Sequence, residues 1–319
     1  MMSPENPYGL CILVPVYHPY SWIAPFMAEA LKTFWPNHPP LFFCGLTSAE
    51  APHLPTLPLS ETALPRDWTV FTLEAISALQ SQGFSQCYLL LEEHLPLAPC
   101  QTTHLNSTLP ALLEKLQGSY IGLMGWDNRR YTTRAPLLPQ NEYCLMHLST
   151  PQAPRFHLHP SLWRIETLAD ALRLTLHGKN HTPWRFEKVN ERHDAELPAR
   201  WKNGCYQISG ARLSLRKPSI AQKISRWIER FIFHKLMAVH QFVPAGLISK
   251  KLWQWIGFDN FYYDGPYPMF FSGVMAKGEI NPFFIRYMQQ NFQTRRLLEA
   301  LLDAKIQHSH PTSAPTTFI

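Results

Sequence analysis

The stretch QCYLLLEEHLPLAP, which covers residues 86–99, contains a short apolar run that ends at charged residues. An apolar run of this kind, here residues 87–91, is typical of a strand buried on both faces of a parallel α/β sheet. Glu92, Glu93 and His94 follow the run, and open α/β sheets bind ligands where their strands end. The stretch therefore predicts an α/β fold with a candidate site at this strand end. The alternative is that these charges are simply solvated there, which is common.

The residues before this stretch predict a β-α-β unit. Residues 10–16 (LCILVPV) form an apolar run rich in β-branched residues, and residues 41–44 form a second short run. Between them, aromatic residues and alanine recur at every fourth position, which indicates a helix over residues 20–34. No GxGxxG motif follows the first strand, so the pattern argues against a classical dinucleotide site.

The alternation of strand and helix continues after residue 99. The pattern of apolar residues predicts helices over residues 67–82, 109–116, 161–177 and 184–191, and strands over residues 120–125, 143–148 and 155–158. This alternation, clearest up to residue 130, favours a layered α/β fold with a mostly parallel sheet flanked by helices.

The basic residues are concentrated in one segment near the C-terminus. The whole chain has a net charge of +6, whereas residues 212–257 carry nine basic residues and one acidic residue, and therefore +8. Aromatic residues alternate with these charges in helices predicted over residues 220–239 and 247–258. Such helices lie at membrane interfaces, although an ordinary packed helix with a solvated basic rim is the alternative. The composition thus divides the chain into residues 1–210, a helical extension over 211–307 and a disordered tail over 308–319.

Cysteine usage and the N-terminal sequence indicate the compartment. The six cysteines form no CxxC pair, so we expect free thiols in a reducing environment. The first residues show no signal-peptide pattern, and no apolar run is long enough for a spanning helix. The basic segment contains no nucleic-acid reading motif. We therefore expect a cytoplasmic protein, or one that is peripheral at the inner face of the membrane, with no nucleic-acid partner.

Four stretches occur in a distinctive order along the chain. They are ILVPVYHPYSW at residues 12–22, RDWTVFTLEAISAL at 66–79, CYLLLEEHLPL at 87–97, and FHLHPSLWRIETLADAL at 156–172 with HTPWRFE at 181–187. Together they resemble bacterial nucleotide-sugar glycosyltransferases of the GT-A type, in particular enzymes that build surface polysaccharide and lipopolysaccharide. The resemblance covers roughly residues 8–210 and rests on pattern and order, because no single motif is diagnostic.

The resemblance implies a GT-A-like, Rossmann-like domain that transfers a sugar, with inversion, from a nucleotide-diphosphate donor to a glycan or lipid-linked acceptor. Carried over by position, the donor-binding residues are Pro15, Val16, Tyr17, Trp68 and Glu92. The residues at the acceptor side are His159, Trp163 and Trp184. Glu187 matches the later WxxE element and is the candidate base for the acceptor hydroxyl. Glu93 and His94 stand at the position that binds Mn²⁺ or Mg²⁺ on the diphosphate.

Some positions depart from the family's pattern. The acidic motif contains no aspartate, His94 replaces an acid, and His159 stands where glutamine is usual. A Glu-Glu-His site binds a divalent cation more weakly or with different selectivity, so loss of metal dependence or of activity is an alternative. The second hypothesis is therefore a catalytically degenerate GT-A-like scaffold, and a third is a membrane-surface binding protein that acts through residues 212–257.

Several of these side chains also have structural interpretations. Glu187 is equally well explained as an acidic residue near a helix N-terminus, which the helix dipole favours. Trp163 is better explained as a core residue among apolar neighbours on a predicted helix. Basic residues after residue 125 are either part of the diphosphate site or of a solvated loop, and they are Arg129, Arg130 and Arg134.

Overall fold

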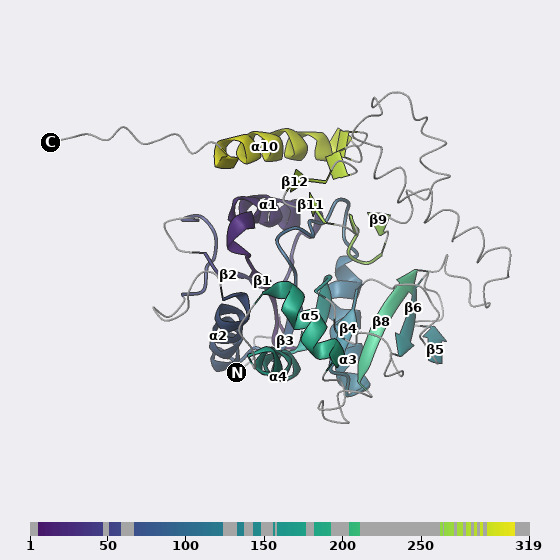
Figure 1. The fold of residues 1–319 in the computed structure, drawn as a ribbon. Helices are drawn as coiled ribbons and strands as arrows, with labels where there is room; N and C mark the ends of the chain where they lie inside the picture. The colour runs from purple at the N-terminus through teal and green to yellow at the C-terminus, as the bar shows by residue number, and fades with distance from the viewer. Residues whose placement is uncertain are drawn as a thin grey trace.

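The structure, a computed structural model, is an α/β fold in which helices cover both faces of one mixed sheet (Figure 1). It describes residues 6–46, 51–58, 67–123, 133–136, 143–147, 156, 158–176, 182–192, 204–210, 262–263, 265–270, 273–276, 279–281, 284–285, 288–289 and 292–309. The α/β class predicted from the alternation of strands and helices is therefore confirmed.

The sheet has eight strands in the order β2-β1-β3-β7-β4-β8-β6-β5. Their bounds are Leu10–Pro15 (β1), Leu41–Cys44 (β2), Gln86–Leu89 (β3), Tyr120–Gly122 (β4), Thr133–Pro136 (β5), Tyr143–His147 (β6), Ser161–Arg164 (β7) and Cys205–Gly210 (β8). β1 is parallel to β2 and β3, and β4 is parallel to β8, whereas β7 and β6 are antiparallel to each of their neighbours. Most strands therefore share one direction, as predicted, and β7 and β6 make the sheet mixed.

Two layers of helices cover the sheet. One face carries the 3-10 helix η1 (His18–Ile23), α1 (Ala24–Phe34), the π-helical turn η2 (His104–Thr108) and α3 (Leu109–Lys115). The opposite face carries α2 (Trp68–Ser81), α4 (Ile165–Thr175) and α5 (Pro183–Arg192).

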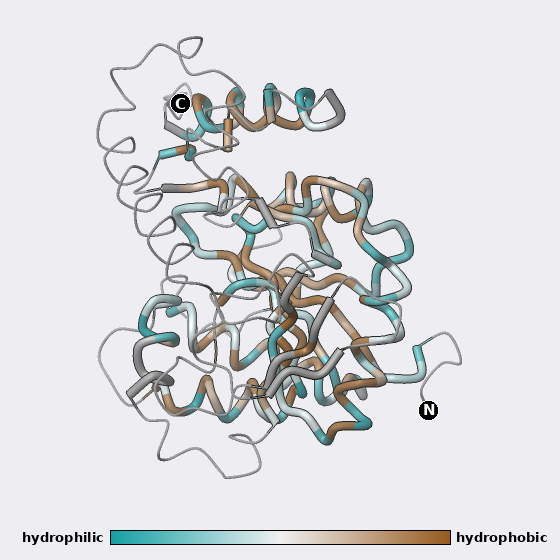
Figure 2. Tube along the Cα trace, turned by 90° about the vertical axis from the view of Figure 1, so that its right-hand side faces the viewer, coloured by the Kyte–Doolittle hydropathy of each residue, from teal (hydrophilic) through white to brown (hydrophobic). Residues whose placement is uncertain are grey.

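The central strands are buried from both sides. In β1, Ile12 belongs to the cluster under α1, whereas Leu13 belongs to the cluster under α2. In β3, Tyr88 belongs to the cluster under α1 and Leu89 to the cluster under α2. The apolar runs are continuous rather than alternating because both faces of these strands exclude water. Brown, hydrophobic stretches run through the middle of the tube in Figure 2.

One predicted element is wrong in a way that affects the site. Residues 161–177 were expected to form a single helix, but Ser161–Arg164 is strand β7 and α4 begins at Ile165. β7 lies between β3 and β4 and pairs with both, so it satisfies backbone groups of both neighbours. These bonds join residues that are far apart in the sequence, so the pattern of apolar residues within 161–177 cannot predict them. The strand expected over residues 155–158 is not found at the described residues Phe156 and Leu158.

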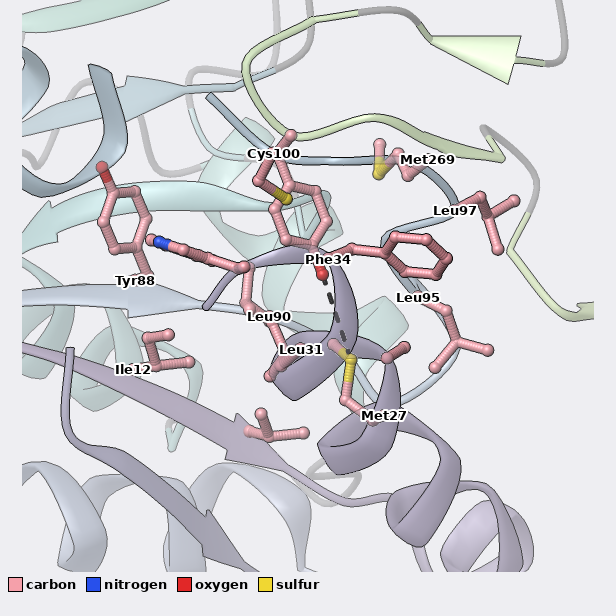
Figure 3. Close-up of a cluster of buried hydrophobic side chains, with 14 of the residues drawn as sticks. Ile12, Met27, Leu31, Phe34, Tyr88, Leu90, Leu95, Leu97, Cys100 and Met269 are labelled. Atoms are coloured by element: carbon pink, nitrogen blue, oxygen red, sulfur yellow. Dashed lines mark hydrogen bonds between the residues drawn. The ribbon is translucent and has the colours of Figure 1, made fainter. Parts of the chain in front are cut away.

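The described C-terminal residues include a segment that we call the strap, which comprises residues 265–270, 273–276 and 279–281. It contains the short strands β10 (Met269–Phe270), β11 (Met275–Ala276) and β12 (Glu279–Ile280), and β10 pairs with β9 (Tyr262–Tyr263). Met269 of the strap packs among side chains of α1 and of the loop after β3, including Phe34 and Leu97 (Figure 3).

The C-terminal helix α10 (Phe292–Ser309) completes this layer. Leu298 and Leu301 belong to the same buried cluster as α1, and the Lys305 amine lies 5.9 Å from the centroid of the Trp22 ring. The described part of the predicted extension thus shares the core of the α/β sheet, although composition divides the chain at residue 210. The helix also continues through Ser309, beyond the predicted start of the tail, and residues 310–319 lie outside the described residues. None of the described helices is both long and apolar enough to cross a membrane.

Candidate functional site

The candidate site lies where β1 and β3 end at one edge of the sheet. β3 ends at Leu89, two residues before the apolar run does, and Glu92 and Glu93 lie in the turn that follows. The backbone N–H of Tyr17, just after β1, donates to Glu92 Oε1 over 3.2 Å. Because neighbouring parallel strands end side by side, residues far apart in the sequence meet here.

Glu92 and Glu93 form a pair of buried carboxyl groups. Burial raises the pKa of Glu92 well above its ordinary value, the charge of Glu93 adds to the effect, and the hydrogen bond from Tyr17 opposes it. Burial also raises the pKa of Glu93 to about 7, against a hydrogen bond from the backbone N–H of Met275. The pair therefore retains protons at a pH where exposed carboxyl groups are ionised.

Three aromatic side chains form a row beside this pair. The ring of Tyr17 contacts the ring of Tyr20 edge-on, with centroids 5.6 Å apart, and the ring of Trp184 in the same way at 5.4 Å. Trp184 is 52% exposed, which is unusual for a tryptophan on a packed helix. The row therefore offers an open aromatic surface on which a base or the apolar face of a sugar can stack.

His94 and His159 form a second pair on the far side of the acidic turn. His159 Nδ1 and His94 Nε2 are 3.3 Å apart. Burial lowers the pKa of His94 to about 4, so its ring is neutral at physiological pH. His94 Nδ1 is buried and has no hydrogen-bond partner among the described residues.

Helix α5 connects these groups. Trp184 and Glu187 lie one turn apart on it, and Glu187 Oε1 accepts the backbone N–H of Leu158 over 2.8 Å. Leu158 immediately precedes His159. The contacts thus form a closed circuit, which runs through Tyr17, Glu92, Glu93, His94, His159, Leu158, Glu187 and Trp184. All of the predicted site residues in this circuit are brought together at one edge of the sheet.

The remaining predicted site residues lie beneath this edge. Trp68 is fully buried, and its indole N–H donates to the Pro15 carbonyl over 3.4 Å. Pro15 and Val16 are buried as well, so these three residues support the end of β1 from within the core.

Trp163, expected at the acceptor side, is a core residue. It is fully buried in β7, its ring lies 4.6 Å from that of Tyr120 and 4.7 Å from that of Phe156, and its indole N–H donates to Ser161 Oγ. The side chain of Trp163 is thus enclosed between aromatic neighbours, which agrees with the core packing that the sequence favoured for it.

The residues at this edge do not fit the divalent cation that the resemblance implies. Glu92, Glu93 and His94 direct their side chains to three different segments, namely Tyr17, Met275 and His159. Over the described residues, no group of three or more His, Cys, Asp or Glu side chains is placed to hold a metal ion. No cation therefore takes part in the reaction that we propose below.

The structure adds residues that the sequence pattern did not reveal. The Val274 N–H donates to the Glu93 carbonyl over 2.9 Å, and the Tyr267 hydroxyl donates to the His94 carbonyl over 2.8 Å. Both come from the strap, which no periodicity connects with the turn after β3. The glycine at 273 is the one local signal, since it marks a turn in the sequence FFSGVM.

Two groups of predicted basic residues cannot be placed at the site. Arg129 and Arg130, the side chain of Arg134 and the whole of residues 212–257 lie outside the described part of the chain. No protein-family model matches the sequence, and a search of curated proteins finds no match.

Proposed function

We propose that this chain is a glycosyltransferase of GT-A-like architecture that moves a sugar from a nucleotide-diphosphate donor to a glycan or lipid-linked acceptor in cell-surface polysaccharide synthesis. The observation that carries the proposal is the closed circuit of contacts at the ends of β1 and β3. It joins residues from three of the four stretches that resemble such enzymes. Trp68 comes from the remaining stretch, residues 66–79, and its indole N–H donates to the Pro15 carbonyl. The mixed α/β sheet is compatible with this architecture.

The aromatic row combines Tyr17, which was expected at the donor, with Trp184, which was expected at the acceptor side, and we assign both rings to the donor. Trp184 and Tyr17 come from different segments and present their rings beside the acidic turn. Aromatic rings stack on bases and sugar rings with little loss of conformational entropy, because few torsion angles in a tyrosine or tryptophan side chain have to be ordered. The proposal therefore places the nucleotide or its sugar against Trp184, with Glu92 fixed by Tyr17 beneath it.

The reaction is a single displacement in this proposal. The acceptor hydroxyl oxygen forms a bond to the anomeric carbon, the bond from that carbon to the diphosphate oxygen breaks, and the electron pair leaves with the diphosphate. Glu187, held by the Leu158 N–H, is the proposed base for the hydroxyl proton. The charge of the leaving diphosphate needs positive groups, and we assign that role to Arg129, Arg130 and Arg134.

A catalytically degenerate scaffold is the second candidate. The observation that favours it is that the Glu92 and Glu93 carboxyl groups are bound by the protein's own backbone N–H groups. In that case the circuit would serve to hold segments together, and the protein would bind a partner instead of turning over a donor.

Donor binding separates the two candidates. Full-length protein would be titrated calorimetrically with UDP, GDP, CMP and dTDP sugars, with and without Mn²⁺. We expect selective binding of one nucleotide class, and we expect Trp184→Ala to weaken it by about 1–3 kcal/mol, the usual effect of removing an aromatic ring from a stacked base. Because Trp184 is 52% exposed, the substitution should change unfolding free energy by no more than about 0.5 kcal/mol.

Leu176→Ala is the matched control, because Leu176 is also exposed and lies at the end of α4, outside the circuit. Equal losses in the two variants would remove the aromatic row from the donor site. Absence of binding to every donor would favour the scaffold. Release of free nucleotide that disappears in Glu187→Gln while binding persists would support the base assignment.

A further inference from the structure

The strap follows the loop after β3 along its length. The Leu97 N–H donates to the Pro268 carbonyl, and the Gln101 N–H donates to the Pro266 carbonyl, each over 2.9 Å. Farther along, the Tyr267 hydroxyl and the Val274 N–H reach the carbonyls of His94 and Glu93. The segment that carries the acidic motif is therefore bound to residues near the C-terminus.

Glu93 is the point at which the strap turns. The Met275 N–H donates to its carboxyl group, and Gly273 has a φ of +68° directly beside it. A Cβ at position 273 would lie 3.0 Å from Glu93 Cδ and Oε2, so only glycine allows this approach without a shift.

Asn281 closes the same turn from the other side. Its backbone N–H donates to the Val274 carbonyl over 2.7 Å, and its side chain donates to the Gly273 carbonyl over 3.5 Å. Asn281 is itself buried. The strap therefore holds Glu93 at two points, because the Met275 N–H donates to its carboxyl group and the Val274 N–H donates to its backbone carbonyl. Gly273 and the buried Asn281 fix the turn that presents these two N–H groups.

The neighbours of Glu93 in the sequence bind other segments. Glu92 accepts the Tyr17 N–H after β1, and the His94 ring contacts His159 before β7. Burial raises the pKa of Tyr20, whose ring contacts that of Tyr17, and the charges of Glu93 and Glu92 add to the effect. Three successive side chains thus join three segments around the aromatic row.

We infer that Glu92-Glu93-His94 is a structural junction in place of a cation site, and that Glu93 is a positioning residue which holds the strap as a wall of the candidate site. The inference goes beyond the proposed function, because the junction would exist in a transferase and in a scaffold alike. It assigns the C-terminal strap, which the sequence grouped with a membrane-docking extension, to the edge of the sheet where ligands bind.

Amide hydrogen exchange of the full chain, with no donor present, tests this inference. We expect Glu93→Ala to speed exchange at Met275 by about tenfold, the effect of losing roughly one net hydrogen bond. Exchange at Val274 should speed less, because its acceptor is the backbone carbonyl of residue 93, which the variant keeps. We expect Glu93→Gln to restore most of the protection, because an amide oxygen still accepts an N–H. Exchange within β1 and α2 should stay at the wild-type rate.

Glu92→Gln is the matched control, since it changes the adjacent carboxyl group, whose partner is Tyr17 and not the strap. Gly273→Ala disturbs the same contact from the strap, because its added methyl group crowds the Glu93 carboxyl group. It should speed exchange at Val274 and Met275, and it serves as the test if Glu93→Ala does not fold. Unchanged exchange of the strap in Glu93→Ala and Gly273→Ala, or equal loosening in Glu92→Gln, would overturn the junction. So would protection of these amides by Mn²⁺ or Mg²⁺ in the wild type that is lost in Glu93→Gln, because that result would identify a cation site.

Discussion

The pKa values of two adjacent side chains in the turn after β3 are shifted in opposite directions by the same cause. Burial disfavours the charged form of both, which raises the pKa of Glu93 to about 7 and lowers that of His94 to about 4. Glu93 therefore destabilises the fold as the pH rises from about 4.5 to about 7, where it must ionise. His94 destabilises the fold as the pH falls from about 6.5 to about 4, where it must take up a proton. Between about pH 4.5 and 6.5 the two effects oppose each other.

Removing His94 should expose the contribution of the acids. In His94→Gln we expect the free energy of unfolding to fall as the pH rises from 4.5 to 7, by about 3 kcal/mol from Glu93 alone. Glu92 adds to the fall, since its pKa is raised too. Urea unfolding at a series of pH values, in the presence of a chelator, measures the slope. Exposed His53 provides the control, as His53→Gln should keep the flatter wild-type profile. A flat profile in His94→Gln would show that the acids are not held as described.

At the level of helices and strands, β7 decides which residues face the site. Because Ser161–Arg164 is extended, alternate residues enter opposite faces of the sheet, and Trp163 enters the cluster under α2 and α4. α5 belongs to the same cluster through Phe186, whereas Trp184 on α5 remains exposed beside Tyr17. Two tryptophans that the resemblance placed together at the acceptor side are therefore a core residue and a surface residue.

Substitution of these tryptophans should separate stability from binding. We expect Trp163→Ala to cost about 3–5 kcal/mol of unfolding free energy, because it empties a fully enclosed site between Tyr120 and Phe156. Trp163→Phe should cost less, since it keeps most of the ring contacts. Trp184→Ala is the control with nearly wild-type stability. Chemical denaturation measures all three, and a cost below about 1 kcal/mol for Trp163→Ala would contradict the core assignment.

Across the whole molecule, the C-terminal residues belong to the main core. Tyr267, Met269 and Leu301 pack in the cluster that contains Ile12 and Leu31. Deleting everything after residue 210 would therefore open this cluster to water, at roughly 1.5–3 kcal/mol for each large apolar side chain exposed. Contact between the basic segment and an anionic membrane, which the sequence predicts, must therefore be tested by substitution and not by truncation.

We expect glutamine at four basic positions to reduce binding to anionic vesicles while the fold stays intact. The positions are Lys223, Arg226, Arg230 and Lys235. Each basic residue near such a surface contributes about 1 kcal/mol, so the loss should be large at low salt and small at high salt. Co-sedimentation with vesicles that contain an anionic lipid measures it.

The control for this measurement is a variant with the same change in charge elsewhere. Four exposed basic residues outside the segment serve this purpose, namely Lys32, Lys115, Arg295 and Arg296. Equal losses in the two variants would show that net charge alone drives binding. Unchanged binding after substitution within the segment would contradict the membrane contact predicted for residues 212–257.

The edge of the sheet that carries the candidate site was predictable because its signals are local. A continuous apolar run that ends in Glu92 and Glu93 indicates a buried strand and its end, and Leu10–Pro15 reads in the same way. Parallel strands that share a sheet then place Tyr17 beside Glu92. The partners of Glu93 and His94 were not predictable in this manner, since Met275 and His159 are distant in the sequence and follow no shared pattern.

Periodicity and composition were therefore sufficient for the α/β class, for most elements and for the position of the candidate site. Tertiary structure alone decided that 161–164 is a strand, that Trp184 is exposed beside Tyr17, and that the strap binds Glu93. The physical reason is the range of the interactions. The burial of an apolar run can be predicted from the residues of that run alone. Strand pairing and a backbone hydrogen bond to a carboxyl group depend on segments that meet only when the chain has folded.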